Sequence, residues 1–192
     1  MKKTLLTLGL LAGSALSTQA AVLLTEGFND ITDLGGKGWV QTNNSAPLGT
    51  TAWFQGNSGI FEAASGAPTA YVAANFNNAD PSGGTVSNWL ITPVISMVNG
   101  TALSFALRLL GETYLDTVEV YYSTSGASAD VGASSSSVGV FSLLHTYASD
   151  TDTDWVNGTV TLSGLGGPAT GRFAFRYVVD DNLNAGNYIV SV

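Results

Sequence analysis

The stretch GRFAFRYVV, residues Gly171–Val179, alternates large apolar side chains with other residues along its length. Every second residue from Phe173 to Val179 is apolar, and Arg172 and Arg176 occupy the alternate positions that face the other way. Successive side chains of a β-strand point to opposite faces of the sheet, so this period of two predicts a strand with one buried face.

The same alternation recurs elsewhere in the chain, in ALSFALRL at 102–109 and in LDTVEVYYS at 115–123. No stretch after the first twenty residues has sustained helical periodicity. Turn-forming sequences separate the predicted strands, and Asn99-Gly100 between two apolar runs indicates a hairpin. The sequence therefore predicts an all-β protein with an antiparallel sandwich of short strands. Further strands are expected at 22–25, 38–42, 52–55, 69–74, 138–147, 156–162 and 188–192.

The first twenty residues have the pattern of a signal peptide. Lys2 and Lys3 precede an apolar run, and Ala20 offers a small residue for cleavage. The apolar run is shorter than the roughly 20 residues that a membrane-spanning helix needs. We expect residues 1–20 to be removed, residues 21–192 to fold as a single domain, and the protein to be secreted or held at the cell surface.

The net charge limits which partners the protein can bind, and the absence of cysteine limits how its fold can be held together. The chain has 14 acidic and 6 basic residues, and loss of Lys2 and Lys3 makes its formal net charge of −8 more negative by two. Nucleic acids and anionic membranes need Lys and Arg contacts, so neither is an expected partner. Since the chain has no Cys, packing or a bound ion must hold the fold without disulfides. We expect a monomer.

The segment SNWLITPVI, Ser87–Ile95, concentrates apolar residues around one proline. Pro93 has no N–H, so Thr92-Pro93 should mark an edge, a bulge or a bend where the segment changes partners. We expect the residues on both sides of the proline to feed one core. The serine-rich stretch at 125–137 is expected to be an exposed loop between two strands.

SNWLITPVI also resembles a motif of the cleaved-adhesin and choice-of-anchor J domains of bacterial extracellular proteins. Weaker matches follow the same order along almost the whole chain: EGFND, GW, WF, LSFALR, VEVYYSTSG, Trp155 ahead of a V-x-L-S strand, and GRFAFRYV. The resemblance implies a jelly-roll β-sandwich with a non-catalytic role in adhesion or glycan contact, often with structural calcium.

The C-terminal stretch GNYIVSV departs from that resemblance. Domains of the group usually carry an Asp-containing insert between the residues that match Ile189 and Val190. They also commonly carry a C-terminal anchor, which would follow Val192. We expect either an unanchored secreted form or a truncated chain.

A calcium site is expected where the chain ends of a jelly roll meet. Calcium takes six to eight oxygen ligands, so clustered carboxylates are needed. Glu26 matches an acidic residue of the family, and Asp180 and Asp181 follow a long predicted strand and could complete the site. The missing Asp and the alternative of solvated loop acids weigh against it. Asp150–Asp154 imitates an EF-hand loop, but Trp155 stands where that loop needs Gly.

The sequence offers little for catalysis. His145 is the only histidine and no G-x-S-x-G motif is present, so a structural role for it is preferred to a catalytic triad. A glycoside hydrolase needs two carboxyl groups flanking a cleft, and no pair is nominated. We expect a protein that is not an enzyme.

Carbohydrate contact remains the main functional hypothesis. Sugars stack on aromatic rings, and the four Trp residues lie in strand-like patterns, where core positions are expected for most. Tyr114 and Tyr121 are the better exposed candidates for glycan stacking. The predicted function is a secreted module that binds a glycan or matrix component; a purely structural matrix protein, or less readily a glycoside hydrolase, are the alternatives.

Overall fold

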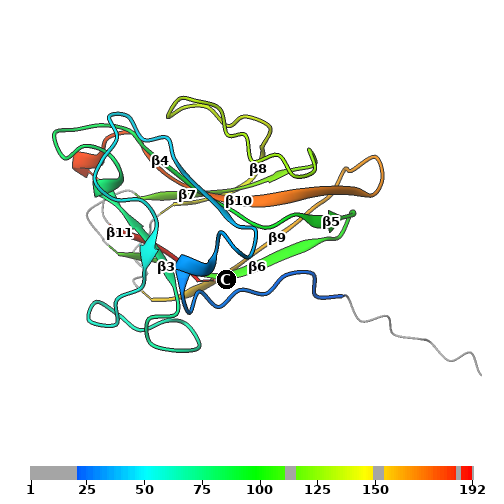
Figure 1. The fold of residues 1–192 in the computed structure, drawn as a ribbon, viewed down its shortest axis with the longest axis horizontal. Helices are drawn as coiled ribbons and strands as arrows, with labels where there is room; N and C mark the ends of the chain where they lie inside the picture. The colour runs from blue at the N-terminus through cyan, green and yellow to red at the C-terminus, as the bar shows by residue number, and fades with distance from the viewer. Residues whose placement is uncertain (1–20, 111–115, 149–153, 185–186, 192) are drawn as a thin grey trace, which may run out of the picture.

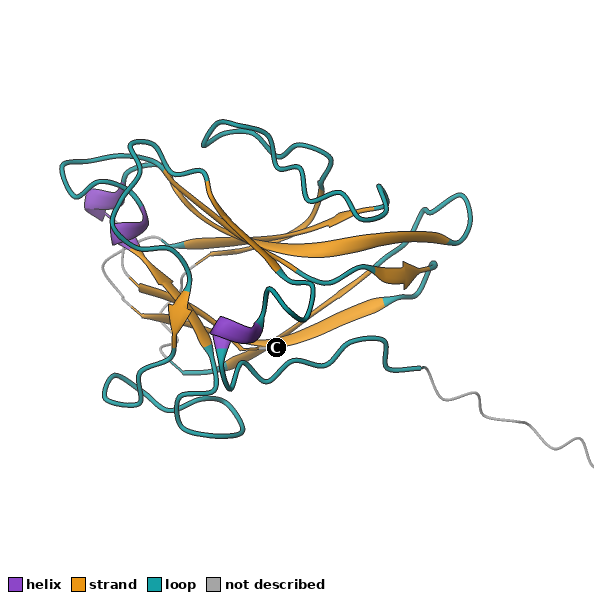
Figure 2. Ribbon diagram, in the orientation of Figure 1, coloured by secondary structure: helices purple, strands orange, loops and turns teal. Residues whose placement is uncertain are grey.

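The computed structural model describes residues 21–110, 116–148, 154–184 and 187–191 and shows two antiparallel β-sheets packed face to face (Figures 1 and 2). The first sheet has the order β1-β4-β10-β7-β8, with β5 also paired to β10. The second has the order β2-β3-β11-β6-β9. The predicted all-β jelly-roll sandwich is confirmed.

The strands of the first sheet are β1 (Val40–Asn43), β4 (Val86–Ile91), β5 (Ile95–Met97), β7 (Thr117–Ser123), β8 (Ser142–Ala148) and β10 (Ala169–Val179). The second sheet consists of β2 (Phe54–Gln55), β3 (Val72–Asn75), β6 (Ala102–Leu110), β9 (Val156–Thr161) and β11 (Asn187–Ser191). In the described part of the chain, three single 3-10 turns accompany them: η1 (Ile31–Asp33), η2 (Phe76–Asn78) and η3 (Asn182–Asn184).

The alternation in β10 builds the core between the sheets. Phe173, Phe175 and Tyr177 are buried in the main apolar cluster. Phe175 meets Phe105 of the opposite sheet edge to face, with 5.0 Å between ring centroids. Such aromatic contacts add to the free energy gained by removing the rings from water.

The segment around Pro93 belongs to the core on both faces of its sheet. β4 lies between β1 and β10 and all its residues are buried. Beyond Pro93, β5 pairs with the same strand β10, but β1 has ended. The Thr92 hydroxyl accepts the N–H of Phe173 at 3.0 Å, which bridges the interruption. Of the edge, bulge or bend that we expected, the pairing matches a bulge, because Ile91 pairs with Ala174 and Ile95 with Gly171, which leaves one extra residue on the proline side. Only the β1 side loses its partner.

The serine-rich stretch at 125–137 is a loop between β7 and β8, as expected, but it is only partly exposed. It folds back over the outer face of the first sheet, where its Val131 packs against Trp89, Ile91 and Tyr121, together with Phe141 from the residues just before β8. Arg172 and Arg176, on the outer side of β10, hold it by bonds to the carbonyls of Ala127 and Ser135. A second, smaller core results, which the period-two pattern of the strands does not reveal.

The Asn99-Gly100 turn does not close a hairpin, so that prediction is wrong. β5 pairs with β10 in the first sheet, and β6 pairs with β11 and β9 in the second. The turn therefore carries the chain from one layer to the other. Asn99 fastens it through two hydrogen bonds with the backbone of Leu165, at 2.8 and 3.0 Å.

Candidate functional site

A shallow groove of about 350 Å³ lies on the outer face of the second sheet, over β6 and β9. One wall comes from Ala64 and Ser65, in the loop between β2 and β3. Its other lining residues are Ser104, Phe105 and Ala106 of β6, and Asn157, Gly158 and Thr159 of β9.

The alternation of β6 and β9 decides which side chains reach this groove. On β6, Leu103, Phe105 and Leu107 are buried in the core between the sheets. Ser104 and Ala106 consequently face outward, because neighbouring residues of a strand point to opposite faces. β6 pairs with β9 so that Ser104 lies opposite Thr159 and Ala106 lies opposite Asn157. The two hydroxyls of the first pair hydrogen-bond to each other at 3.0 Å.

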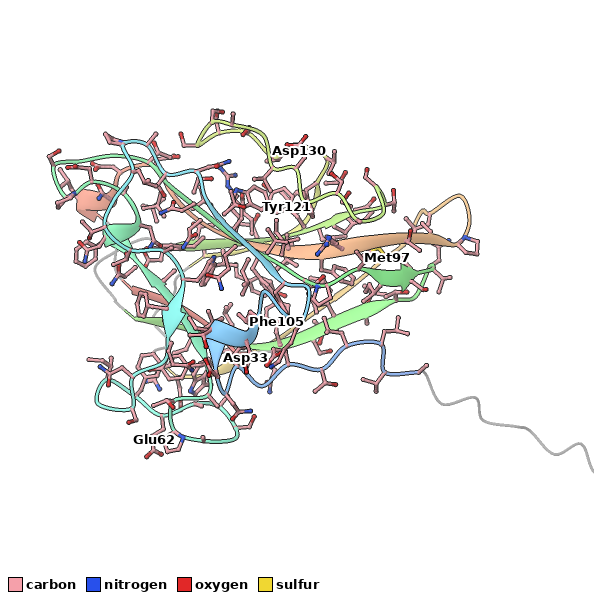
Figure 3. All side chains as sticks on the ribbon, viewed as in Figure 1. Asp33, Glu62, Met97, Phe105, Tyr121 and Asp130 are labelled. Atoms are coloured by element: carbon pink, nitrogen blue, oxygen red, sulfur yellow. The ribbon has the colours of Figure 1, made fainter. Side chains whose placement is uncertain are left out.

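At Gly158, in the floor of the groove, the backbone of β9 lies directly against a core residue. A Cβ at this position would lie only 2.5 Å from the ring of Phe105. Glycine therefore lets that ring pack against the backbone of β9 from inside the sandwich. Figure 3 shows Phe105 between the two layers.

The groove wall is fastened by a group of side chains that we call the end cluster: Phe61, Tyr71, Arg108 and Trp155. Phe61 and Tyr71 stack with 5.0 Å between ring centroids, and Arg108 lies over the Phe61 ring at 4.3 Å. The Trp155 indole N–H donates to the carbonyl of Glu62 at 2.9 Å. Glu62 belongs to the loop that projects beyond the sheet (Figure 3).

Tyr71 holds the beginning of the same loop. Its hydroxyl accepts the N–H of Asn57 at 2.7 Å and donates to the Asn57 carbonyl at 2.8 Å. Burial raises the pKa of the Tyr71 phenol above its ordinary value. The hydroxyl therefore stays neutral and keeps both roles at physiological pH.

The groove is lined by hydroxyls, one amide, methyl groups, peptide backbone and Phe105, and none of the eight lining residues has a charged side chain. Such a surface offers hydrogen-bond donors and acceptors without attracting ions of either sign. It suits an uncharged ligand rich in hydroxyl groups.

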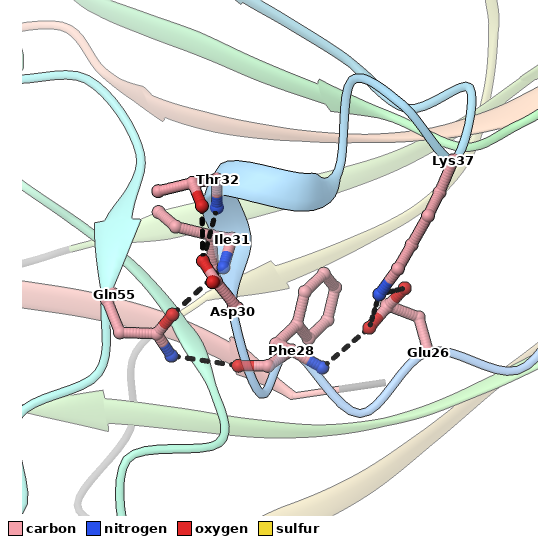
Figure 4. Close-up of polar contacts among 7 residues, drawn as sticks. All are labelled: Glu26, Phe28, Asp30, Ile31, Thr32, Lys37 and Gln55. Atoms are coloured by element: carbon pink, nitrogen blue, oxygen red, sulfur yellow. Dashed lines mark hydrogen bonds and ion pairs between the residues drawn. The ribbon is translucent and has the colours of Figure 1, made fainter.

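The predicted calcium ligand Glu26 already has partners. It is 6% exposed, its Oε1 accepts the N–H of Phe28 at 2.9 Å, and its Oε2 lies 3.1 Å from Lys37 Nζ (Figure 4). In the same view, Gln55 Oε1 accepts the N–H of Ile31 at the start of η1, the turn that Asp30 caps by accepting the N–H of Thr32. Glu26 therefore fastens the first residues of the described chain to the turn before β1, which carries Lys37.

Asp180 and Asp181 lie at the end of β10, beside the loop before β4. The carbonyl of Asp180 accepts the Thr85 hydroxyl at 3.3 Å, and Asp181 Oδ1 accepts the N–H of Leu183 at 3.1 Å. Within the described ranges, no three Asp, Glu, His or Cys side chains gather closely enough to hold a metal ion. The three predicted ligands are thus not brought together, and calcium binding stays a prediction.

Tyr121 is not the exposed platform that we expected. It is 4% exposed, its ring lies 5.0 Å from that of Trp89, and its hydroxyl donates to Glu119 at 2.8 Å. Figure 3 shows it beneath the loop that carries Asp130. The expectation of exposure is wrong because that loop covers the outer face. Tyr114 lies outside the described residues.

The structure also places the tryptophans, the single histidine and part of the acidic run that the sequence analysis considered. Trp39, Trp53 and Trp89 are buried, as expected for core residues. His145 lies exposed on β8, with its ring 4.4 Å from that of Tyr147. Of the acidic run at 150–154 only Asp154 is described, and its Oδ1 is 3.9 Å from Arg108 Nη1.

The groove residues were not singled out in the sequence. Their only signal is that Ser104, Ala106, Asn157 and Thr159 are small or polar at outward positions of two strands. The pairing of β6 with β9 across some fifty residues is what joins them, and a single sequence does not show that pairing.

Comparisons with known proteins bear on the fold. No family model matches the sequence, and no curated protein matches it either. The structure is similar to the K1 cleaved adhesin domain of Lys-gingipain from Porphyromonas gingivalis W83. That match has a TM-score of 0.57 at 22% identity, over 80% of this chain and 87% of that domain.

The K2 cleaved adhesin domain of Lys-gingipain is also similar, with a TM-score of 0.59 at 18% identity, over 88% of this chain and 94% of that domain. In the described part of the chain, no helix is long and apolar enough to cross a membrane. The resemblance to cleaved-adhesin domains that SNWLITPVI indicated is confirmed for the fold, since this chain has a β-sandwich similar to that of the K1 and K2 domains.

Proposed function

We propose that the protein is a non-catalytic binding module of the cell exterior whose groove over β6 and β9 takes a neutral glycan. The observation that carries the proposal is the uncharged lining of that groove, with Ser65, Ser104, Asn157 and Thr159 as its polar side chains. Sugar hydroxyls bind through such side chains, which fix the orientation of the ligand.

The same lining argues for binding rather than hydrolysis. Glycoside hydrolases flank the scissile bond with two carboxyl groups, and the eight lining residues of the groove include neither Asp nor Glu. A neutral ligand also agrees with the acidic chain, whose formal net charge of −8 would repel polyanionic polysaccharides.

The fold and the leader support a place outside the cell. The structurally similar K1 and K2 domains are named as cleaved adhesin domains, and residues 1–20 have the pattern of a signal peptide. Calcium is not part of this proposal, because Glu26 is bound to Lys37 and lies apart from Asp180 and Asp181.

An array of neutral and acidic glycans tests the proposal directly. We expect saturable binding to neutral glycans by residues 21–192, and weakening by about tenfold or more when Ser104→Ala and Thr159→Val are combined. Each lost hydrogen bond to a ligand is worth about 1 kcal/mol, and 1.4 kcal/mol corresponds to tenfold in affinity. Because the two hydroxyls bind each other, replacing both leaves no orphaned partner.

Thr146→Val is the matched control, since Thr146 is exposed on β8 of the other sheet. It should leave affinity unchanged. Absence of saturable binding to any glycan, or equal affinity of the double variant and the wild type, would contradict the proposal. Accumulation in an extracellular matrix without saturable binding would instead favour a purely structural role.

A further inference from the structure

We infer that the groove receives the end of a glycan chain and not an internal stretch of it, an inference that rests on the proposed function. The reason is that the groove is blocked in one direction along the strands and open in the other.

The end cluster blocks one direction. The last groove-lining pair is Ala106 and Asn157, and two residues further along the same outer face stand Arg108 and Trp155. Small side chains thus give way to the long side chain of Arg108 near the end of β6 and to the indole of Trp155, the residue just before β9. Arg108 is only 20% exposed, because it lies over the Phe61 ring.

The blocking side chains are held in place. The Phe61 ring contacts the Trp155 ring at 5.8 Å, edge to face, and Arg108 Nη1 lies 3.9 Å from Asp154. The indole N–H of Trp155 is bound to Glu62, in the loop that carries the groove wall. The end cluster and the loop that forms the groove wall are therefore joined. Moving the end cluster aside would also displace that loop.

The opposite direction is open. The next pair beyond Ser104 and Thr159 is Ala102 and Thr161, and both of these side chains are small and exposed. The chain then turns at Gly100, where nothing lies within 4 Å of a Cβ position. A glycan can leave the groove on this side over the sheet surface.

One closed and one open end make a site for a terminal unit. The last sugar would lie over Ala106 against the end cluster, and the following units would pass Ser104 and Thr159 towards Thr161. A groove open at both ends would instead accept any stretch of a polymer.

Binding of glycans of different length distinguishes a groove closed at one end from a groove open at both ends. The probes are linear neutral oligosaccharides of glucose, mannose, xylose and galactose with two, four and eight units, and the matching polymers. For the sugar that binds, we expect one protein per chain at every length, by titration calorimetry and by sedimentation of the polymer complex. The Kd per chain should level off once the groove is filled, with four and eight units agreeing within twofold.

A variant at the open side adds a second readout. Thr161→Leu places a larger side chain in the exit path without touching the core. It should weaken binding of the eight-unit chain at least fivefold and that of the disaccharide less than twofold. Thr146→Val again serves as the control and should change neither.

The outcomes distinguish this inference from the proposed function. Several proteins on each polymer chain, with tighter binding per chain as length grows, would overturn chain-end binding but leave glycan binding intact. Equal effects of Thr161→Leu on long and short chains would also overturn it. No binding of any probe would overturn the proposed function and this inference together.

Discussion

Arg176 shows how a charged side chain becomes part of a packed interior. Its Nη1 lies 2.9 Å from Glu119 Oε2 and its Nε donates to the Ser87 hydroxyl at 3.0 Å. The guanidinium also lies 5.3 Å from the centre of the Trp89 ring. A buried charge is tolerated when it is paired and hydrogen-bonded in this way.

Replacing Arg176 by Met should destabilise the protein by about 3 kcal/mol, because Glu119 loses its countercharge in a half-buried position. Urea denaturation measures this loss of unfolding free energy, and amide hydrogen exchange should rise in residues 127–141. Arg176→Lys keeps the charge but not the planar fork, so an intermediate loss is expected. A loss below about 0.5 kcal/mol, typical of exposed sites, would show that the pair contributes nothing to holding the loop.

The pKa of the Tyr121 phenol reports on its burial beneath the loop that covers the outer face of the first sheet. Burial, reinforced by the neighbouring Glu119, raises the pKa of Tyr121 to about 12. In the unfolded chain a tyrosine ionises near pH 10. The stability from the neutral phenol is therefore complete below about pH 10 and is lost as the pH rises from there through about 12.

Ultraviolet absorbance of phenolate should show this tyrosine titrating late, and Tyr121→Phe should remove that step from the alkaline titration. The variant should also lose less stability than the wild type between about pH 10 and pH 12. Titration of every tyrosine near pH 10 in the folded protein would contradict the buried position.

The sequence correctly predicted which face of a strand each of these side chains lies on. It predicted less well whether another part of the chain covers that face. Phe173, Phe175 and Tyr177 face the core as their spacing indicates. Tyr121 was placed on the correct face of its strand, opposite Val120, but was expected in solvent. Its cover comes from Val131 and Phe141, two apolar residues within a stretch rich in Ser and Gly, and their docking is a tertiary contact.

β10 is the strand on which the first sheet is organised. It pairs with β4 and β5 along one side and with β7 along the other. Gly171 lies close against the end of β7, and a Cβ there would lie 1.8 Å from the carbonyl oxygen of Ser123. The backbone of β7 would have to move to accept any side chain.

Gly171→Ala should therefore lower the free energy of unfolding by about 2 kcal/mol or more, as overpacking in a core does. Gly166→Ala is the matched control, because nothing lies within 4 Å of its Cβ position. That control should be neutral in thermal and urea unfolding. Equal stabilities of the two variants would show that β10 and β7 are not so closely apposed.

Strand positions were predictable, but strand partners were not. β6, β7 and β10 lie where period-two alternation placed them. The hairpin expected at Asn99-Gly100 fails because turn chemistry specifies a reversal without saying which strands then pair. The strand expected at 22–25 is not formed, although Leu24 packs against the core as an apolar residue would.

The candidate site was harder to predict from the sequence than the fold class, because the site is formed by pairing between distant parts of the chain. Fold class followed from local alternation and from the resemblance of SNWLITPVI, and the similar K1 and K2 domains agree with it. The groove needs β6 beside β9, and the β2–β3 loop fastened over them by Trp155. These contacts join residues far apart in the chain, so composition and spacing did not indicate them.

Chemical-shift mapping of a glycan complex tests the central claim, that the outer face of β6 and β9 binds a neutral glycan. Residues 21–192 would be titrated with the four-unit oligosaccharide that binds, while backbone amide signals are followed. We predict that the largest shifts fall on Ser104, Phe105, Ala106, Asn157, Gly158 and Thr159, the groove-lining residues of the two strands. Shifts concentrated on the loop over Trp89 and Tyr121, or spread evenly over both sheets, would contradict the account.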